Sequence, residues 1–147
     1  MALIVQKYGG TSVADPDRMR AVAEHIEFTK RHGNDVVVVV SAMGKSTDNL
    51  IKLANDVSRT QPGREMDMLL TTGERISMPL LCMALADRGV EAMSFTGSQV
   101  GIITDTVHTK AKILEVKGDR VREALAQGKV CVVAGFQGVS TAKEITT

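Results

Sequence analysis

Residues that could bind an anion are concentrated near the N-terminus. An apolar segment, Leu3–Gln6, is typical of a short strand that carries Lys7 at its end and is followed by Gly9 and Gly10. Asp15-Pro16 then predicts a helix start, because Asp caps free amides and Pro fits the first helical position. Backbone amides of a glycine turn and a helix N-terminus, together with a lysine ammonium, suit a phosphate group. The alternative is an ordinary strand-to-helix turn with Lys7 at the rim of the strand.

Hydroxyl side chains follow the second predicted strand. Ser41 comes directly after five valines, and Thr47 lies where a helical pattern begins. In open α/β sheets, ligands bind outside the carboxyl ends of the strands, so we expect both hydroxyls to share one crevice with Lys7 and the two glycines. The alternative is that Ser41 and Thr47 cap local backbone groups.

An acidic residue, Glu74, interrupts a largely apolar helical segment within Thr71-Thr72-Gly73-Glu74. A glycine inside a helix costs about 1 kcal/mol relative to alanine, so this segment predicts a helix that breaks or restarts near Glu74. An acid is favourable at a helix start, and the residues alone favour that structural role. A second glycine-bounded strand exit, Gly135–Gly138, contains Phe136, but its spacing is neither a dinucleotide fingerprint nor a P-loop.

Periodicity and turn residues predict an α/β architecture around these residues. A helix over 16–32 between strands 3–8 and 35–40 makes a β-α-β unit, and the five valines are typical of a parallel strand covered on both faces. Two more helices follow: one with Leu50, Leu53, Ala54 and Val57 on its apolar face, and one over about 74–88 with a kink at Pro79. The remaining predictions are strands over 90–95, 100–104, 111–116 and 129–134, a loop over 96–99, a helix over 118–128 and a terminal segment, 144–147, without a turn.

Composition argues against several classes of function. The 147 residues carry 18 basic and 17 acidic side chains, three Phe, one Tyr and no Trp, without a basic block, which argues against a nucleic-acid partner. No apolar run is long enough for a membrane span and no signal peptide is recognised, so a cytoplasmic, single-domain protein is expected. Cys82 and Cys131 lie in apolar segments typical of buried, reduced thiols. The three histidines show no metal-ligand spacing with them, so no metal site is predicted.

Five segments, in order along the chain, resemble the motifs of the aspartate kinases, which belong to the amino acid kinase superfamily. They are Lys7–Ser12, Val38–Gly44 with Thr47, Leu70–Glu74, Ser94–Gln99 and Ala134–Gly138. Because the resemblance covers the whole chain, it implies the fold of that superfamily, a three-layer α/β/α sandwich with a mainly parallel sheet.

The resemblance also implies an activity and residue roles. The activity is ATP-dependent phosphorylation of the side-chain carboxylate of L-aspartate to 4-phospho-L-aspartate, with ATP and Mg²⁺ as cofactors, the first step of lysine, threonine and methionine biosynthesis. Lys7 would contact the transferring phosphate as the catalytic residue, and the phosphate-binding segment would comprise Lys7, Tyr8, Gly9 and Gly10. The amino-acid substrate would be held by Ser41, Thr47, Phe136 and Glu74, with Glu74 receiving its α-ammonium group.

Residues 1–147 are expected to be the N-terminal, substrate-binding part of such a catalytic domain, incomplete at the C-terminus. Aspartate kinases continue after a segment like Glu144–Thr147 into a glycine-rich motif, a nucleotide-binding half with most of the ATP and Mg²⁺ ligands, and ACT regulatory domains. We therefore expect the isolated chain to lack measurable kinase activity.

Two alternatives stay open at this point. The chain could belong to another branch of the superfamily, such as the glutamate 5-kinases, acetylglutamate kinases or uridylate kinases, although a free acid at Glu74 suits an acceptor with an α-ammonium group. It could also be a non-catalytic, truncated subunit. An unpaired sheet edge and exposed apolar helix faces would then favour a homo-oligomer or association with another chain.

Overall fold

The computed structural model describes residues 1–147, and its main feature is a four-stranded sheet, sheet A. Sheet A consists of β1 (Leu3–Tyr8), β2 (Asp35–Val40), β6 (Val130–Ala134) and β3 (Ala92–Phe95). The strands are ordered β1-β2-β6-β3, and every neighbouring pair is parallel. The predicted α/β class with a mainly parallel sheet is therefore confirmed.

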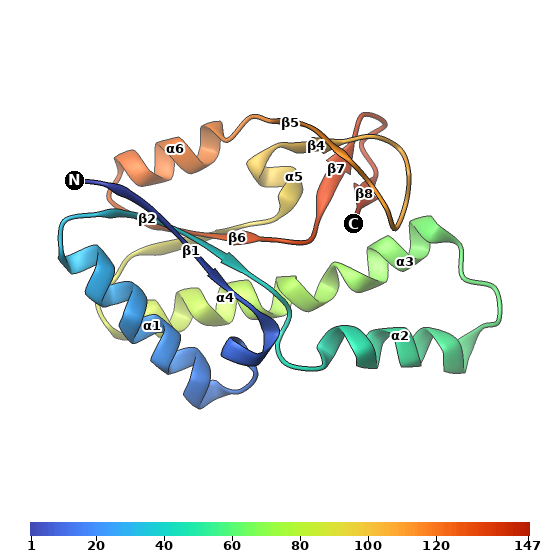
Figure 1. The fold of residues 1–147 in the computed structure, drawn as a ribbon, viewed down its shortest axis with the longest axis horizontal. Coiled ribbons are helices and arrows are strands. Elements are labelled where there is room, and N and C mark those ends of the chain that lie inside the picture. The colour runs from blue at the N-terminus through green and yellow to red at the C-terminus, as the bar shows by residue number, and fades with distance from the viewer.

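Helices lie on both sides of sheet A (Figure 1). α1 (Pro16–Arg31) and α4 (Thr72–Asp87) cover one face, and α6 (Asp119–Ala126) lies with the short α5 (Gly97–Val100) on the other. The start of α1 is as predicted, because the Asp15 side chain accepts a hydrogen bond from the Arg18 backbone N–H at 2.8 Å. None of the helices combines the length and apolar character needed to cross a membrane.

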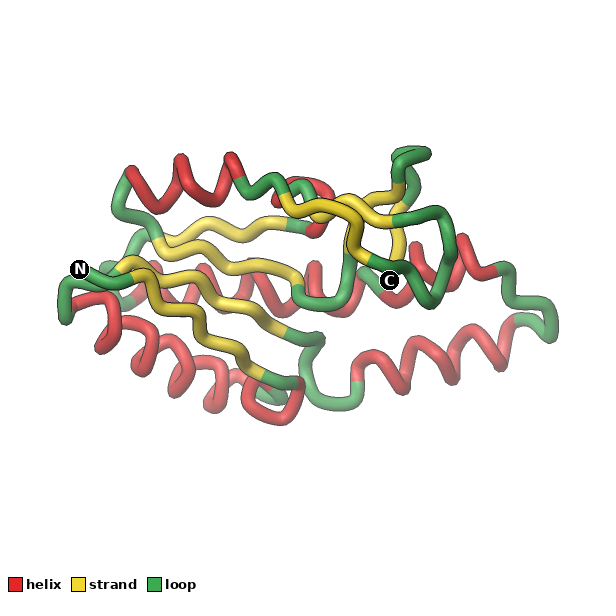
Figure 2. The backbone as a smooth tube through the Cα atoms, turned by 45° about the horizontal axis from the view of Figure 1, so that its top comes forward, coloured by secondary structure: helices red, strands yellow, loops and turns green.

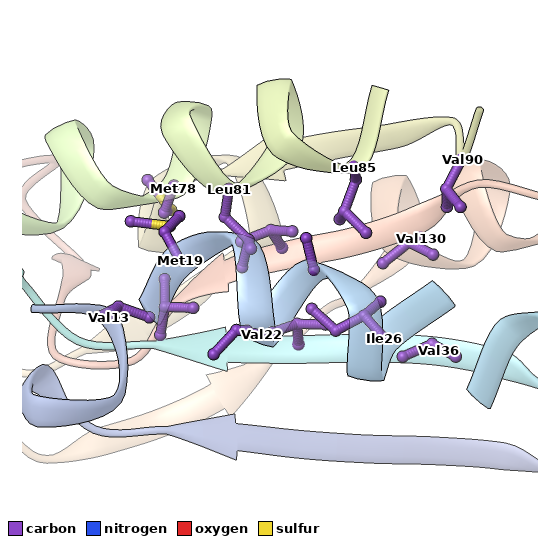
Figure 3. Packing of buried hydrophobic residues seen from close by; sticks show 14 of the residues in the cluster. Val13, Met19, Val22, Ile26, Val36, Met78, Leu81, Leu85, Val90 and Val130 are labelled. Carbon is purple, nitrogen blue, oxygen red and sulfur yellow. The ribbon is translucent and has the colours of Figure 1, made fainter. Parts of the chain in front are cut away.

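The main core lies between sheet A and the helices α1 and α4 (Figure 3). It contains fifteen buried side chains, among them Met19, Val22 and Ile26 of α1 and Met78, Leu81 and Leu85 of α4. From β2, the alternate residues Val36, Val38 and Val40 are buried in this core. The intervening Val37 and Val39 are only half-buried, so the predicted full cover on both faces of β2 holds for one face only.

The second face of sheet A is covered unevenly. β6 is buried along its whole length, and Cys131 and Val133 belong to a smaller core cluster with Ala124 of α6. At the sheet edge, β1 leaves Leu3 and Val5 60% and 63% exposed. The helical layer on this face therefore reaches β6 and β3 but not β1 (Figure 2).

α2 (Ser46–Val57) and α3 (Gly63–Leu70) form a pair of helices that extends away from sheet A (Figure 1). The apolar face predicted for α2 is left largely uncovered, since none of its residues is buried and Val57 is 79% exposed. α3 ends at Leu70 and α4 begins at Thr72, so the predicted helix break lies at Thr71, three residues before Glu74. Pro79 lies inside α4.

A smaller sheet, sheet B, contains β5 (Ile113–Val116), β4 (Ile102–Thr104), β7 (Gly138–Ser140) and β8 (Ile145–Thr146) in that order. β4 and β7 are parallel, and the two outer pairs are antiparallel. β4 and β5 lie within predicted strands, and the terminal segment 144–147 has no turn of its own, as predicted, but the sequence did not predict that it forms β8 in a hairpin with β7. The Ser140 hydroxyl accepts hydrogen bonds from the backbone N–H groups of Ala142 and Glu144, at 3.2 and 3.1 Å, and so closes the turn between β7 and β8.

Residues 96–99, which the sequence predicts as a loop, instead begin α5. The Thr96 hydroxyl accepts a hydrogen bond from the Gln99 backbone N–H at 3.2 Å, and the Gln99 side chain accepts one from the Thr96 backbone N–H at 3.0 Å. This reciprocal pair is a capping box, which stabilises a helix start. Because α5 has only four residues, it leaves no apolar period in the sequence.

Candidate active site

The parallel strands of sheet A all end at one edge. Tyr8 pairs with Val40, Val40 pairs with Ala134, and Val133 pairs with Phe95, so the four carboxyl ends lie within about one residue of each other in register. The glycine turn, Ser41, Gly135 and Thr96 directly follow these ends. The segments that were predicted to contribute to one crevice therefore all follow strand ends at this one edge of sheet A.

Lys7 lies on the face of β1 that α1 does not cover, and its side chain is exposed. No carboxylate of the chain forms an ion pair with its ammonium. Tyr8 points to the opposite face, where its ring lies edge-on to His25 of α1 with 6.4 Å between ring centroids. The two side chains are thus separated by the sheet, and Tyr8 contributes only its backbone to the edge that carries Lys7.

The glycine turn after β1 is held against the turn after β2. Gly9 is the N-cap of a short 3-10 helix, Gly10–Val13, which lies between β1 and α1. The Gly10 carbonyl accepts a hydrogen bond from the Gly44 N–H at 2.9 Å, and the Tyr8 carbonyl accepts one from the Ser41 N–H at 3.2 Å. The first two predicted motifs are therefore in direct backbone contact.

Ser41 and Thr47 are both half-buried, and neither hydroxyl forms a hydrogen bond within the chain. The cap position of α2 is Lys45, which makes no side-chain capping bond, so the local-capping alternative for these two hydroxyls is wrong. The Ser41 carbonyl accepts a hydrogen bond from the buried Ser77 hydroxyl of α4 at 2.7 Å. α4 thus fixes the Ser41 backbone while the hydroxyl stays free for a ligand.

Glu74 lies in the first turn of α4 and is only 2% exposed. Its Oε2 accepts a hydrogen bond from Gln137 Nε2 at 2.9 Å, but its buried Oε1 has no partner. Burial raises the pKa of this carboxyl to about 7, and the Gln137 amide and the backbone of Phe136 and Gly135 oppose that rise. A buried carboxylate with one unsatisfied oxygen is suited to a cationic donor from a ligand.

Gln137 is a site residue that the sequence did not identify. It is buried, and Nε2 donates both to Glu74 and, at 3.2 Å, to the carbonyl of Thr71 at the α3–α4 junction. The neighbouring Phe136, which was predicted as a site residue, has a 53% exposed side chain, and its backbone faces Glu74. A polar residue directly before a glycine at the exit of a buried strand is the sequence signal that could have identified Gln137.

A model of the amino acid kinase family matches residues 2–147. The chain belongs to the amino acid kinase family. Among the members of this family to which it is similar, the aspartokinase of Mycolicibacterium smegmatis is 60% identical over 100% of this chain, which spans 35% of that protein.

Solved amino acid kinase structures agree with this fold. The chain matches the crystal structure of aspartate kinase from Synechocystis with a TM-score of 0.82 and 51% identity, over 99% of this chain and 23% of that one. It matches E. coli aspartokinase III with a TM-score of 0.81 and 22% identity, over 100% of this chain and 43% of that one, which supports the fold alone. This chain therefore spans less than half the length of each of these relatives.

Few groups of this amino acid kinase chain are suited to a cofactor. For a phosphate, they are the unpaired Lys7 ammonium and the backbone amides of the glycine turn. No three His, Cys, Asp or Glu side chains gather into a metal site. Cys131 is buried and Cys82 half-buried, both are free, and burial raises the pKa of each thiol to about 11, so neither is a nucleophile near neutral pH.

We expect Gly10→Ala to destabilise the fold by about 1–3 kcal/mol, because overpacking against backbone atoms has no easy relief. A Cβ at Gly10 would lie 2.9 Å from the carbonyl oxygen of Ala42 and 3.1 Å from that of Gly44. Gly9→Ala is the matched control, since no atom lies within 4 Å of a Cβ there and its φ is −75°. Urea denaturation of both variants measures the difference, and equal midpoints would contradict the described contact between the two turns.

Proposed function

We propose that this chain is the N-terminal, amino-acid-binding part of the catalytic domain of an aspartate kinase. That enzyme transfers the γ-phosphoryl group of ATP to the side-chain carboxylate of L-aspartate and forms ADP and 4-phospho-L-aspartate. The observation that carries the proposal is the unpartnered Oε1 of the buried Glu74, at the sheet edge where two free hydroxyls also lie. The 60% identity to a curated aspartokinase supports the choice of acceptor.

The charges of the site fit an amino-acid acceptor. L-Aspartate carries one ammonium and two carboxylates, so its site needs one anion among several donors. Glu74 supplies the anion for the ammonium, and the Ser41 and Thr47 hydroxyls and the Phe136 backbone supply polar contacts to the rest. An acid that is fixed by burial holds the substrate in one orientation, which is the main requirement of phosphoryl transfer.

In this proposal, Lys7 and the glycine turn bind the phosphoryl donor. An ammonium on the open face of β1 neutralises the charge that builds up on a transferring phosphoryl group. Mg²⁺ that accompanies ATP would neutralise further charge on the phosphate oxygens. In this proposal, the nucleotide is the second substrate, and the reaction takes place in the cytoplasm as the first step of lysine, threonine and methionine biosynthesis.

A second candidate is another amino acid kinase, such as one that acts on glutamate. Such an enzyme would share the fold and an acidic residue that accepts the ammonium group. Its substrate, glutamate, differs from aspartate in the longer distance between the ammonium group and the side-chain carboxylate. Because a site built for one spacing misplaces the longer side chain, a comparison of ligands distinguishes the two candidates.

Association with a second copy or another chain is part of the proposal. β1 is an edge strand whose Leu3 and Val5 are mostly exposed, and α2 buries none of its apolar residues. Such edges and patches favour association. Light scattering on the purified chain tests this point, and a monodisperse monomer would contradict it.

Binding calorimetry on the 147-residue chain tests the function. L-Aspartate is expected to bind more tightly than L-glutamate, and N-acetyl-L-aspartate about 100-fold more weakly than L-aspartate, because the acetyl group removes the cation that pairs with Glu74. Equal affinity for the acetylated ligand would exclude Glu74 as the ammonium site. A preference for L-glutamate would instead support the second candidate.

A further inference from the structure

A second buried carboxylate, Asp67 of α3, lies outside the site described above. Asp67 is 0% exposed and accepts hydrogen bonds from three residues. His108 Nδ1 lies 2.7 Å from Oδ2, the Thr109 backbone N–H donates to Oδ1 at 3.1 Å, and the Thr147 hydroxyl donates to Oδ1 at 2.5 Å. Both carboxylate oxygens are therefore satisfied, unlike those of Glu74.

The partners of Asp67 come from sheet B. His108 and Thr109 belong to the connection between β4 and β5, and Thr147 directly follows β8. The Ala111 N–H also donates to the Thr147 carbonyl at 3.0 Å, so the connection and the end of β8 are joined to each other as well. Asp67 thus fastens sheet B to α3, and Figure 1 shows β8 and the C-terminus beside this helix.

Hydrogen bonds also link the backbone of α3 at Asp67, through Thr71 and Gln137, to Glu74. The Asp67 carbonyl accepts a hydrogen bond from the Thr71 N–H at 3.1 Å, and the Thr71 carbonyl accepts one from Gln137 Nε2 at 3.2 Å. The same Nε2 donates to Glu74 Oε2 at 2.9 Å. The α3–α4 junction therefore lies between the two buried carboxylates.

The β7–β8 hairpin connects the same two points by a second route. Gln137 directly precedes β7, and Gly138 of β7 pairs with Thr146 of β8. Gln137 and Thr147 both flank the open end of this hairpin: Thr147 is held to α3 through Asp67, and Gln137 places its amide against Glu74. Release of the Thr147–Asp67 bond would remove one of the contacts that hold the hairpin on α3 and would leave the Gln137 amide with its bond to the Thr71 carbonyl as the remaining attachment there.

We propose that Asp67 is a positioning residue for Glu74: it clamps the β7–β8 hairpin onto α3 and thereby keeps the Gln137 amide on the Glu74 carboxylate. Asp67 touches no reacting group in this arrangement and acts only through Gln137. The role of Glu74 as the ammonium acceptor rests on the proposed function. The clamp itself does not, because it is a property of the chain without a ligand.

The test is a pH titration of Glu74 in the ligand-free 147-residue chain, in which ¹³C NMR of the side-chain carboxyl reports the protonation state. Its resonance is assigned by its loss in Glu74→Gln. The Gln137 hydrogen bond lowers the pKa of Glu74, so Asp67→Ala is expected to raise that pKa by about one unit, the equivalent of one lost hydrogen bond. Thr147→Val removes a single bond of the clamp and is expected to shift the pKa in the same direction by less.

Two variants control for a general loss of rigidity in sheet B that does not involve the Asp67 carboxylate. Thr147→Ser keeps the hydroxyl and is expected to leave the pKa of Glu74 unchanged. Thr104→Val breaks the buried Thr104–Thr146 hydroxyl bond of 2.7 Å within sheet B without touching α3, and it too is expected to have no effect. If Asp67→Ala does not fold, the proposal is tested by the two Thr147 variants: the pKa of Glu74 should rise in Thr147→Val and stay unchanged in Thr147→Ser.

An unchanged pKa in Thr147→Val, or an equal shift in Thr104→Val, would overturn the proposal. Because no ligand is present, these results are independent of whether L-aspartate binds. A chain that fails to bind L-aspartate but shows the expected shifts would refute the proposed function and leave the clamp intact.

Discussion

Glu74→Gln is expected to raise the free energy of unfolding at pH 8 by roughly 3 kcal/mol and to leave it unchanged at pH 4. Burial raises the pKa of the Glu74 carboxyl from 4.5 to about 7. Between these two values the unfolded chain releases a proton that the folded chain retains, so the folded state loses stability as the pH rises. Gln is similar in size and neutral at every pH, and it therefore removes this penalty.

Urea denaturation at pH 4 and pH 8 measures the effect. Glu115→Gln, on the exposed strand β5, removes one carboxylate from the surface and controls for the change in net charge. A Glu74→Gln variant that is equally stabilised at both pH values, or destabilised at pH 8, would show that the buried carboxyl carries no desolvation penalty.

Gly97→Ala is expected to cost about 3 kcal/mol, the upper range for overpacking, because the added methyl group has no room to move. A Cβ at Gly97 would overlap the carbonyl group of Gln137 and lie 2.9 Å from the Cα of Gly138. These are backbone atoms at the start of β7, so relief requires a shift of the segment that holds the Gln137 amide on Glu74. We therefore expect both lower stability and weaker binding of L-aspartate.

Ser98→Ala is the matched control, since Ser98 is the next residue of α5 and its side chain is exposed. Chemical denaturation and calorimetry on both variants give the two readouts. A Gly97→Ala chain with wild-type stability would contradict the close contact between α5 and the Gln137 backbone.

The order and type of the main elements could be predicted because their signals are local. Five consecutive valines form β2, and Asp15-Pro16 begins α1 at the expected residue. Parallel strands place their carboxyl ends at one edge, so the meeting of the glycine turn with Ser41 also followed from the pattern. The position of Glu74 in the first turn of a helix was likewise predictable from the glycine before it.

The partners of the buried carboxylates could not be predicted, because they are distant in sequence. Asp67 lies in an ordinary amphipathic helix pattern, and its carboxylate accepts a hydrogen bond from Thr147, 80 residues away. Gln137 lies 63 residues from Glu74, and nothing in its local sequence indicates which carboxylate it meets. The sequence also could not show that α2 leaves its apolar residues uncovered, since periodicity predicts an apolar face but not what covers it.

The central claim is that a charged Glu74 accepts the ammonium group of L-aspartate, and proton release on binding tests it most directly. Calorimetry in two buffers with different ionisation enthalpies counts the protons released. Because the pKa of Glu74 in the free chain is about 7, binding of the ammonium should release about 0.9 proton at pH 6 and about 0.1 at pH 8. The affinity should then be about tenfold weaker at pH 6 than at pH 8. Equal affinity and no proton release at pH 6 would contradict the account.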